Sequence, residues 1–270
     1  MVALSWVAAV LACLGYGVAS VLQSVGARRT AQAVGVGGLA AILVQLPYLA
    51  GLGADAVAFV ANVVALRELP LFVVQSIVTG SVGVTAVVAS LRGERLRRRD
   101  WTALAVLGAG LVLLCLTANA ERAVRLPTQA QWVILLGGVV PLVVGAVGSR
   151  LRSAAAAPVL AAAAGLAWTG VAVASRGLSG ESWDWSLIGS PLLWAVVLQG
   201  VLGTACFALA LQRGSVTMVT AVTFVSEMVV PSLLGLWLLG DAVRPADVPW
   251  AVLGFVLALS GTVALVRFAK

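Results

Sequence analysis

The stretch TMVTAVTFVSEMVVPSLLGLWLL, residues 217–239, is almost wholly apolar and predicts a transmembrane helix. At about 1.5 Å per residue such a helix is about 34 Å long, which is enough to cross the hydrocarbon core of a bilayer. Glu227 lies near its centre, and a carboxyl group at that depth usually faces a protein interior or a water-filled path. Pro231 follows one turn later and has no N–H for the carbonyl of Glu227, so we expect a helix break there.

The composition extends this prediction to the whole chain. Of its 270 residues 61% are hydrophobic and only 10% are charged, whereas soluble proteins have about 25% charged residues. The apolar runs are continuous rather than alternating, so they predict helices and not the strands of an outer-membrane barrel. We therefore expect an all-α integral membrane protein, with one transmembrane domain over residues 1–270 in a plasma or inner membrane.

Nine transmembrane spans are predicted. They lie at about 4–24, 47–66, 70–91, 101–118, 131–149, 155–175, 190–211, 217–239 and 248–267. The apolar run 36–66 could instead be divided into two short spans, which would make ten. With nine spans and the N-terminus outside, most of the basic residues fall in inner loops, so the positive-inside rule predicts a cytoplasmic C-terminus.

The two halves of the chain share a sequence pattern. The first has ALRELPLFVVQ at 65–75 and, one span later, LRGERLRRRDW at 91–101, while the second has ALQRGSVTMVT at 210–220 and then LLGDAVRPADVPW at 238–250. With nine spans the two patterns have opposite orientations in the membrane. This predicts two inverted repeats, about 1–118 and about 131–270, an arrangement typical of secondary transporters whose substrate site lies near the midplane.

These motifs resemble the drug/metabolite transporter superfamily, and ALRELPLFVVQS at 65–76 is similar to its EamA-like and NIPA-like bacterial branches. The resemblance implies carrier-type transport of a small solute by alternating access, without implying one substrate. Members move amino acids, nucleotide sugars, other metabolites, lipid-linked sugars or, in the NIPA branch, magnesium. Ser76 departs from the pattern, since such sequences commonly have a second proline there, so the resemblance does not imply a kink in this helix.

The candidate site centres on two acids. Asp55 and Glu227 are expected at similar depth, one in each half, where they could share a proton or hold a cation. Alternatively, Glu227 hydrogen-bonds a neighbouring helix and Asp55 lies nearer the inner interface. The other candidates are polar side chains on the same helix faces for binding a substrate or coupling ion, and aromatic side chains for the wall of a pocket: Asn62, Thr220, Thr223, Tyr16, Trp168 and Phe224.

Several function classes are disfavoured. The chain has no histidine and no GxxxxGK[ST] motif, so we expect neither a Ser–His enzyme nor direct use of ATP. Its basic residues lie in short loops, which argues against a nucleic-acid partner. We expect a secondary-active carrier that exports or exchanges a small polar metabolite, coupled to protons or a cation or working by simple exchange. It would use no cofactor, and the bilayer and a small-molecule or ion substrate would be its partners.

The alternatives are a NIPA-like magnesium or divalent cation transporter, a flippase for a lipid-linked sugar, and a membrane scaffold. Magnesium prefers oxygen ligands, so Asp55, Glu227 and backbone carbonyls could hold it, although two carboxyl groups are few ligands for a metal site. The sequence is also compatible with a homodimer.

Overall fold

A computed structural model describes residues 2–29, 45–91, 97–117, 123, 125–181, 184–214, 216–238 and 243–268. All regular structure in these ranges is helical, which confirms the all-α prediction. The part of the 36–66 run before residue 45 lies outside the described residues.

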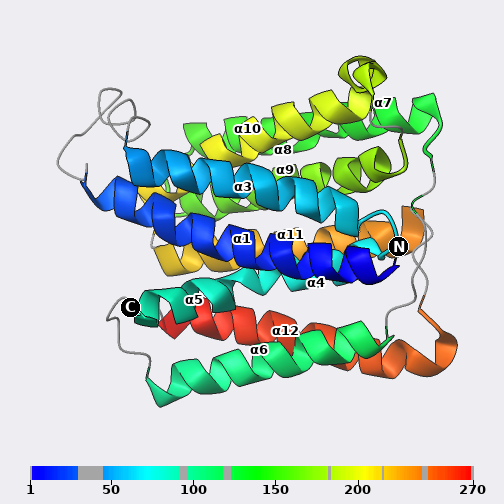
Figure 1. Cartoon of the computed structure of the whole chain (residues 1–270). Helices are drawn as coiled ribbons and strands as arrows, with labels where there is room; N and C mark the ends of the chain where they lie inside the picture. Colours follow the sequence, from blue (N-terminus) through cyan, green and yellow to red (C-terminus); the bar gives the residue numbers. More distant parts are fainter. Residues whose placement is uncertain are drawn as a thin grey trace.

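The helices form an elongated bundle in which long elements run side by side (Figure 1). In chain order they are α1 (Val2–Arg29), α3 (Leu46–Ala65), α4 (Leu71–Thr79), α5 (Ser81–Leu91), α6 (Arg98–Thr117), α7 (Thr128–Gly137), α8 (Val139–Arg150), α9 (Ala156–Ser179), α10 (Pro191–Arg213), α11 (Val216–Leu238) and α12 (Val248–Phe268). Two short 3-10 helices, η1 (Trp185–Gly189) and η2 (Pro245–Asp247), precede α10 and α12.

The helices have the length and apolarity that a bilayer requires. Within the described residues, eight helical segments are long and apolar enough to cross a membrane, with α4–α5 and α7–α8 each counted as one. α11 has 23 residues and contributes the shorter apolar segment Val225–Leu234. Each of the nine predicted spans coincides with one of these helices or helix pairs. The chain is a multi-pass helical membrane protein.

Successive crossings alternate in direction, so α1 begins at one end of the bundle and α12 ends at the other (Figure 1). The end of α1 and the start of α3 lie at the same end. Within the described residues, the helices and helix pairs match the nine predicted crossings. The alternative of ten spans depends on residues before 45, which lie outside the described residues.

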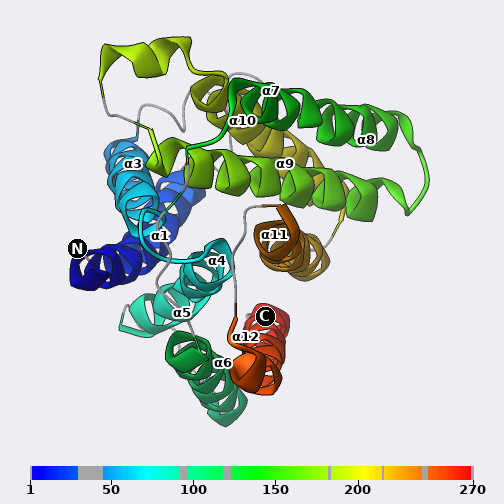
Figure 2. The same ribbon diagram turned by 90° about the vertical axis from the view of Figure 1, so that its right-hand side faces the viewer.

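Helices from the two halves of the chain make matching contacts. α1 packs antiparallel to α3, and α9 packs antiparallel to α10. α4 contacts α11 and α6 contacts α12, so each of these pairs joins an early helix to a late one (Figure 2). The α7–α8 crossing packs on α9 and α10 at the outside of the bundle. Two inverted repeats would produce this pairing, and their boundaries stay a prediction.

The prediction of a helix break at Pro231 is wrong. α11 continues through Pro231 as one helix, and this proline is buried. Proline removes one backbone hydrogen bond, but neighbouring helices and serine side chains compensate for such losses inside membranes. Here α11 packs against α4, α9 and α12.

Single glycines interrupt two other crossings. Gly80 separates α4 from α5, and Gly138 separates α7 from α8. The first interruption occurs without a proline at position 76, where the Ser76 hydroxyl instead donates to the carbonyl of Phe72 at 2.7 Å.

Candidate functional site

Three titratable side chains lie midway along their helices. Tyr16 in α1, Asp55 in α3 and Glu227 in α11 each lie within about one residue of the helix midpoint. Since the helices run side by side (Figure 1), these residues lie at similar depth. In the 20-residue α3 that depth is about 15 Å from either end. A bilayer around the bundle would place all three near its midplane.

Tyr16 lies within electrostatic range of both acids. Its phenol interacts electrostatically with the carboxyl groups of both Asp55 and Glu227. All three residues are half-buried in the bundle. A phenolic O–H can donate a hydrogen bond to a carboxylate, and a carboxylate can also accept from a bound solute. The structure thus brings Tyr16 within electrostatic range of two acids that come from opposite halves of the chain.

Close helix packing on both sides of Tyr16 holds it in place. A Cβ at Gly15 would lie 2.8 Å from the Cβ of Ala58 in α3, and one at Gly17 would lie 2.6 Å from the Cβ of Val84 in α5. Both distances are far below ordinary van der Waals contact, so α1 can approach α3 and α5 this closely only with glycine at these positions. The two contacts fix the rotation of α1 and therefore the direction in which Tyr16 points.

A similar contact positions Glu227. A Cβ at Gly165 in α9 would lie 2.4 Å from the Cβ of Ser226, so the residue next to Glu227 packs directly on α9. The fully buried Thr223 donates its hydroxyl to the carbonyl of Ala161 at 3.2 Å. In this structure Thr223, a predicted binding residue, therefore joins α11 to α9.

Asn62 offers a free acceptor. It lies about 10 Å along α3 from Asp55 on the same helix face, and its side chain is 5% exposed. Within the described residues its Oδ1 is buried without a hydrogen-bond partner. Leaving such a group unsatisfied costs about 1–3 kcal/mol, so a donor from a solute or a water molecule would be favourable there.

The remaining predicted residues are placed differently or lie outside the description. Trp168 packs against α10, where its ring centroid lies 5.4 Å from that of Phe207 and its indole covers Gly203. Thr220 and Phe224 lie in α11, but their side chains are not among those described.

The predicted span 155–175 leaves Arg176 in the loop that follows it, and this placement is wrong. Arg176 lies within α9, is 4% exposed, and donates to the carbonyl of Leu69 at 2.7 Å and to that of Leu66. It thereby ties α9 to the turn between α3 and α4. Thr169, Ala172, Arg176 and Ser179 share one buried helix face, and this spacing was the signal in the sequence that could have identified it.

Among the residues that the structure covers, no group of three or more His, Cys, Asp or Glu could hold a metal ion. Comparisons of the chain with protein-family models, with curated proteins and with solved structures found no match. The proposals below therefore depend on the residues and their geometry.

Proposed function

We propose that this protein is a secondary-active carrier for a small polar solute and that Tyr16, Asp55 and Glu227 form its binding or coupling site. The observation that carries the proposal is the interaction of Tyr16 with both acids midway along the helices. We also propose the orientation that the positive-inside rule favours, with the N-terminus outside and the C-terminus in the cytoplasm.

Electrostatics favours a positively charged occupant. Two carboxylates in a medium of low dielectric repel each other strongly, and burying even one is costly in a membrane. A proton shared between Asp55 and Glu227, a monovalent cation, or an ammonium group on the solute would offset this cost. Tyr16 could donate its O–H to whichever carboxylate remains charged. The site thus suits a solute with an amine group, or proton-coupled movement of a polar solute.

The bundle architecture supports a carrier. α1 and α3 come from the first half of the chain, α11 comes from the second, and α4 joins the halves by packing on α11. Transporters with inverted repeats bind substrates where their halves meet at the midplane. The resemblance of residues 65–76 to the drug/metabolite transporter superfamily also favours a carrier. A divalent cation would find two carboxylates and the Asn62 amide oxygen, so magnesium belongs among the substrates to be tested.

The proposal predicts that Glu227→Gln and Asp55→Asn abolish transport while the protein stays folded. A thermal-shift screen of amino acids, sugars, nucleotides and divalent ions would first identify a ligand, and its uptake into proteoliposomes would then be measured. We expect each variant to lose at least about tenfold in uptake, since each removes a charge from the midplane site.

Asp247→Asn is the matched control, because Asp247 lies in η2, before α12 begins and away from the midplane, and its replacement removes the same charge. Its uptake should equal that of the wild type. If both midplane variants transport as well as the wild type, the two acids are not the site and the proposal fails.

A further inference from the structure

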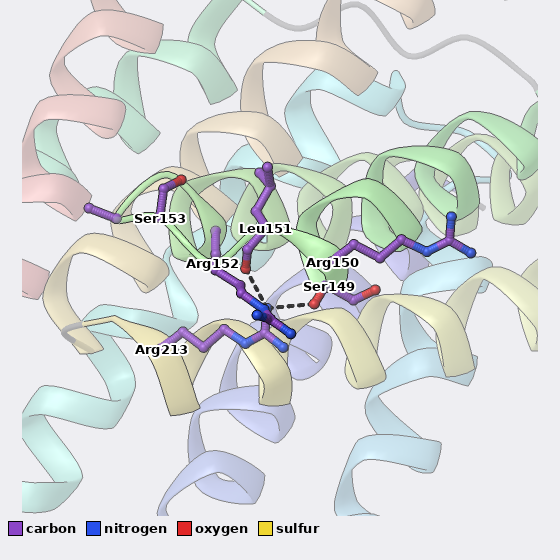
Figure 3. A pocket seen from close by; sticks show the side chains of 8 residues that line it. Ser149, Arg150, Leu151, Arg152, Ser153 and Arg213 are labelled. Carbon is purple, nitrogen blue, oxygen red and sulfur yellow. Dashed lines mark hydrogen bonds between the residues drawn. The ribbon is translucent and has the colours of Figure 1, made fainter.

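A recess of about 840 Å³ opens at the end of the bundle where α8 ends and α9 begins (Figure 3). It is far from the midplane acids and is lined by Arg150, Arg152 and Arg213 together with Ser149, Ser153 and the first residue of α9, Ala156. Three guanidinium groups and the Ser153 hydroxyl are donors for an anion, whereas the Ser149 hydroxyl donates to the carbonyl of Ala146 at 2.8 Å. The recess therefore has the chemistry of an anion site.

Within the described residues, no acidic side chain neutralises the positive charge in this recess. Among these residues no carboxylate lines it. In the described residues, neither Arg150 nor Arg152 makes an ion pair. α9 begins here without a side-chain cap, so the positive end of its helix dipole adds to the same potential. An anion entering the recess would meet only positive or neutral groups.

Backbone carbonyls hold Arg213 in position. Its Nη1 donates to the carbonyls of Gly148 at 3.1 Å, Ser149 at 2.9 Å and Leu151 at 3.4 Å, and these hydrogen bonds cap the end of α8 (Figure 3). Arginine has five N–H donors, so others remain for a ligand. In Figure 3 the side chains of Arg152 and Arg213 reach toward the same part of the recess, whereas Arg150 extends away from them. An anion between Arg152 and Arg213 would offset their mutual repulsion.

The adjoining surface identifies the occupant. Val143, Val147 and Arg150 fall at i, i+4 and i+7 of α8, so they share one helix face. Both valines are exposed, as are Val139, Val140 and Leu142. This is the face that lipid would cover in a membrane. Acyl chains along these side chains would bring a headgroup to Arg150, at the mouth of the recess.

We propose that this recess binds the phosphate of an anionic phospholipid, whose acyl chains lie along the outer face of α8. Basic pockets at the ends of transmembrane helices are suited to such headgroups, and arginine matches the geometry of phosphate oxygens. Arg152 and Arg213 bind the phosphate within the recess, and Arg150 binds the headgroup at its mouth.

Thermal stability in detergent tests the proposal. The delipidated full-length protein in a neutral detergent would be heated with phosphatidylglycerol, phosphatidylcholine or inorganic phosphate. We expect phosphatidylglycerol to raise the midpoint of unfolding and the other two to leave it unchanged. In the variant Arg150→Ala/Arg152→Ala, native mass spectrometry should show at least about fivefold fewer bound phosphatidylglycerol molecules. Both side chains are exposed, so this variant should fold.

Arg97→Ala/Arg98→Ala is the matched control, because it removes the same charge from the same end of the bundle and should bind phosphatidylglycerol normally. Equal losses in both double variants would indicate diffuse attraction and overturn the proposal. Undiminished binding by Arg150→Ala/Arg152→Ala would also overturn it. An equal rise in stability with inorganic phosphate would assign the recess to a soluble anion instead of a lipid.

Discussion

Asn62 carries a buried oxygen for which the described residues provide no donor. An unpaired acceptor in a membrane-embedded bundle is costly, because lipid offers no donor in place of water. Its neighbours on α3 make conventional contacts, since the Ser5 hydroxyl donates to the carbonyl of Val64 at 3.4 Å. A solute or a water molecule that enters the bundle near Asp55 would supply the missing hydrogen bond. Asn62 thus extends the proposed site along α3.

The variant Asn62→Leu separates a binding role from a structural one. Leucine has a similar shape and removes the unsatisfied amide, so we expect the free energy of unfolding to stay the same or rise by about 1 kcal/mol. Uptake of the identified solute into proteoliposomes should nevertheless fall several-fold, because the acceptor is lost. A less stable variant with normal uptake would show that Asn62 is structural.

Gln199→Leu provides the comparison. The Gln199 Nε2 donates to the carbonyl of Ile134 at 3.2 Å, so this buried amide already has a partner. Its loss should lower the free energy of unfolding by about 0.5–1.5 kcal/mol. Chemical denaturation of both variants in the same detergent would measure the difference between a satisfied and an unsatisfied amide.

At the scale of helices, α6 and α12 pack with their backbones in close contact. A Cβ at Gly110 would lie 2.3 Å from the backbone nitrogen of Ala258, and one at Gly261 would lie 2.6 Å from the backbone nitrogen of Leu107. Glycine at these positions lets the last span of each half touch the other directly. Van der Waals contact of this kind holds helices together in lipid, where the hydrophobic effect does not.

We therefore predict that Gly110→Val separates α6 from α12 and destabilises the protein. Overpacking typically costs about 1–3 kcal/mol, and here the clash is with backbone, which cannot rotate away, so we expect the upper end of that range. Gly108→Val is the control on the same helix, since a Cβ there meets nothing within 4 Å. The unfolding midpoints of both variants in detergent would be compared, and equal midpoints would contradict the close packing.

For the whole molecule, alternating crossings place the basic termini of several helices at one end. α6 and α9 begin, and α8 and α10 end, at the end of the bundle where α12 finishes (Figure 1). These helix ends carry Arg97, Arg98, Arg150, Arg152 and Arg213. Positive residues are enriched on the cytoplasmic side. The same end carries the recess proposed for an anionic lipid, and such lipids are abundant in the cytoplasmic leaflet. The proposed orientation, with the C-terminus inside, would place these arginines and the recess on the cytoplasmic side.

Cysteine labelling of intact cells checks this orientation. The native Cys13, Cys115 and Cys206 lie within spans and would first be replaced by alanine. We predict that Ser186→Cys in η1 reacts with an impermeant maleimide in intact cells, whereas Ser153→Cys reacts only after permeabilisation. Both serines are exposed, so accessibility depends on the side of the membrane. The reverse pattern would invert the topology and leave the fold unchanged.

Some features of this chain follow from the sequence by itself. The nine spans and the unusual mid-span acids Asp55 and Glu227 could be identified directly, because lipid requires long apolar helices and excludes charge. Their depth also follows from counting residues along each span. These properties are local to a helix, so they do not require knowledge of its neighbours.

Tertiary structure alone decided which faces meet. It brought Tyr16 within electrostatic range of both acids, turned Thr223 toward α9, buried Arg176 and brought Arg213 to the end of α8. It also kept α11 continuous through Pro231. In a chain that is apolar on nearly every side, hydropathy hardly distinguishes a buried helix face from a lipid-facing one. Backbone contacts at a few glycines set the rotation of each helix instead, and those contacts exist only once the helices have packed.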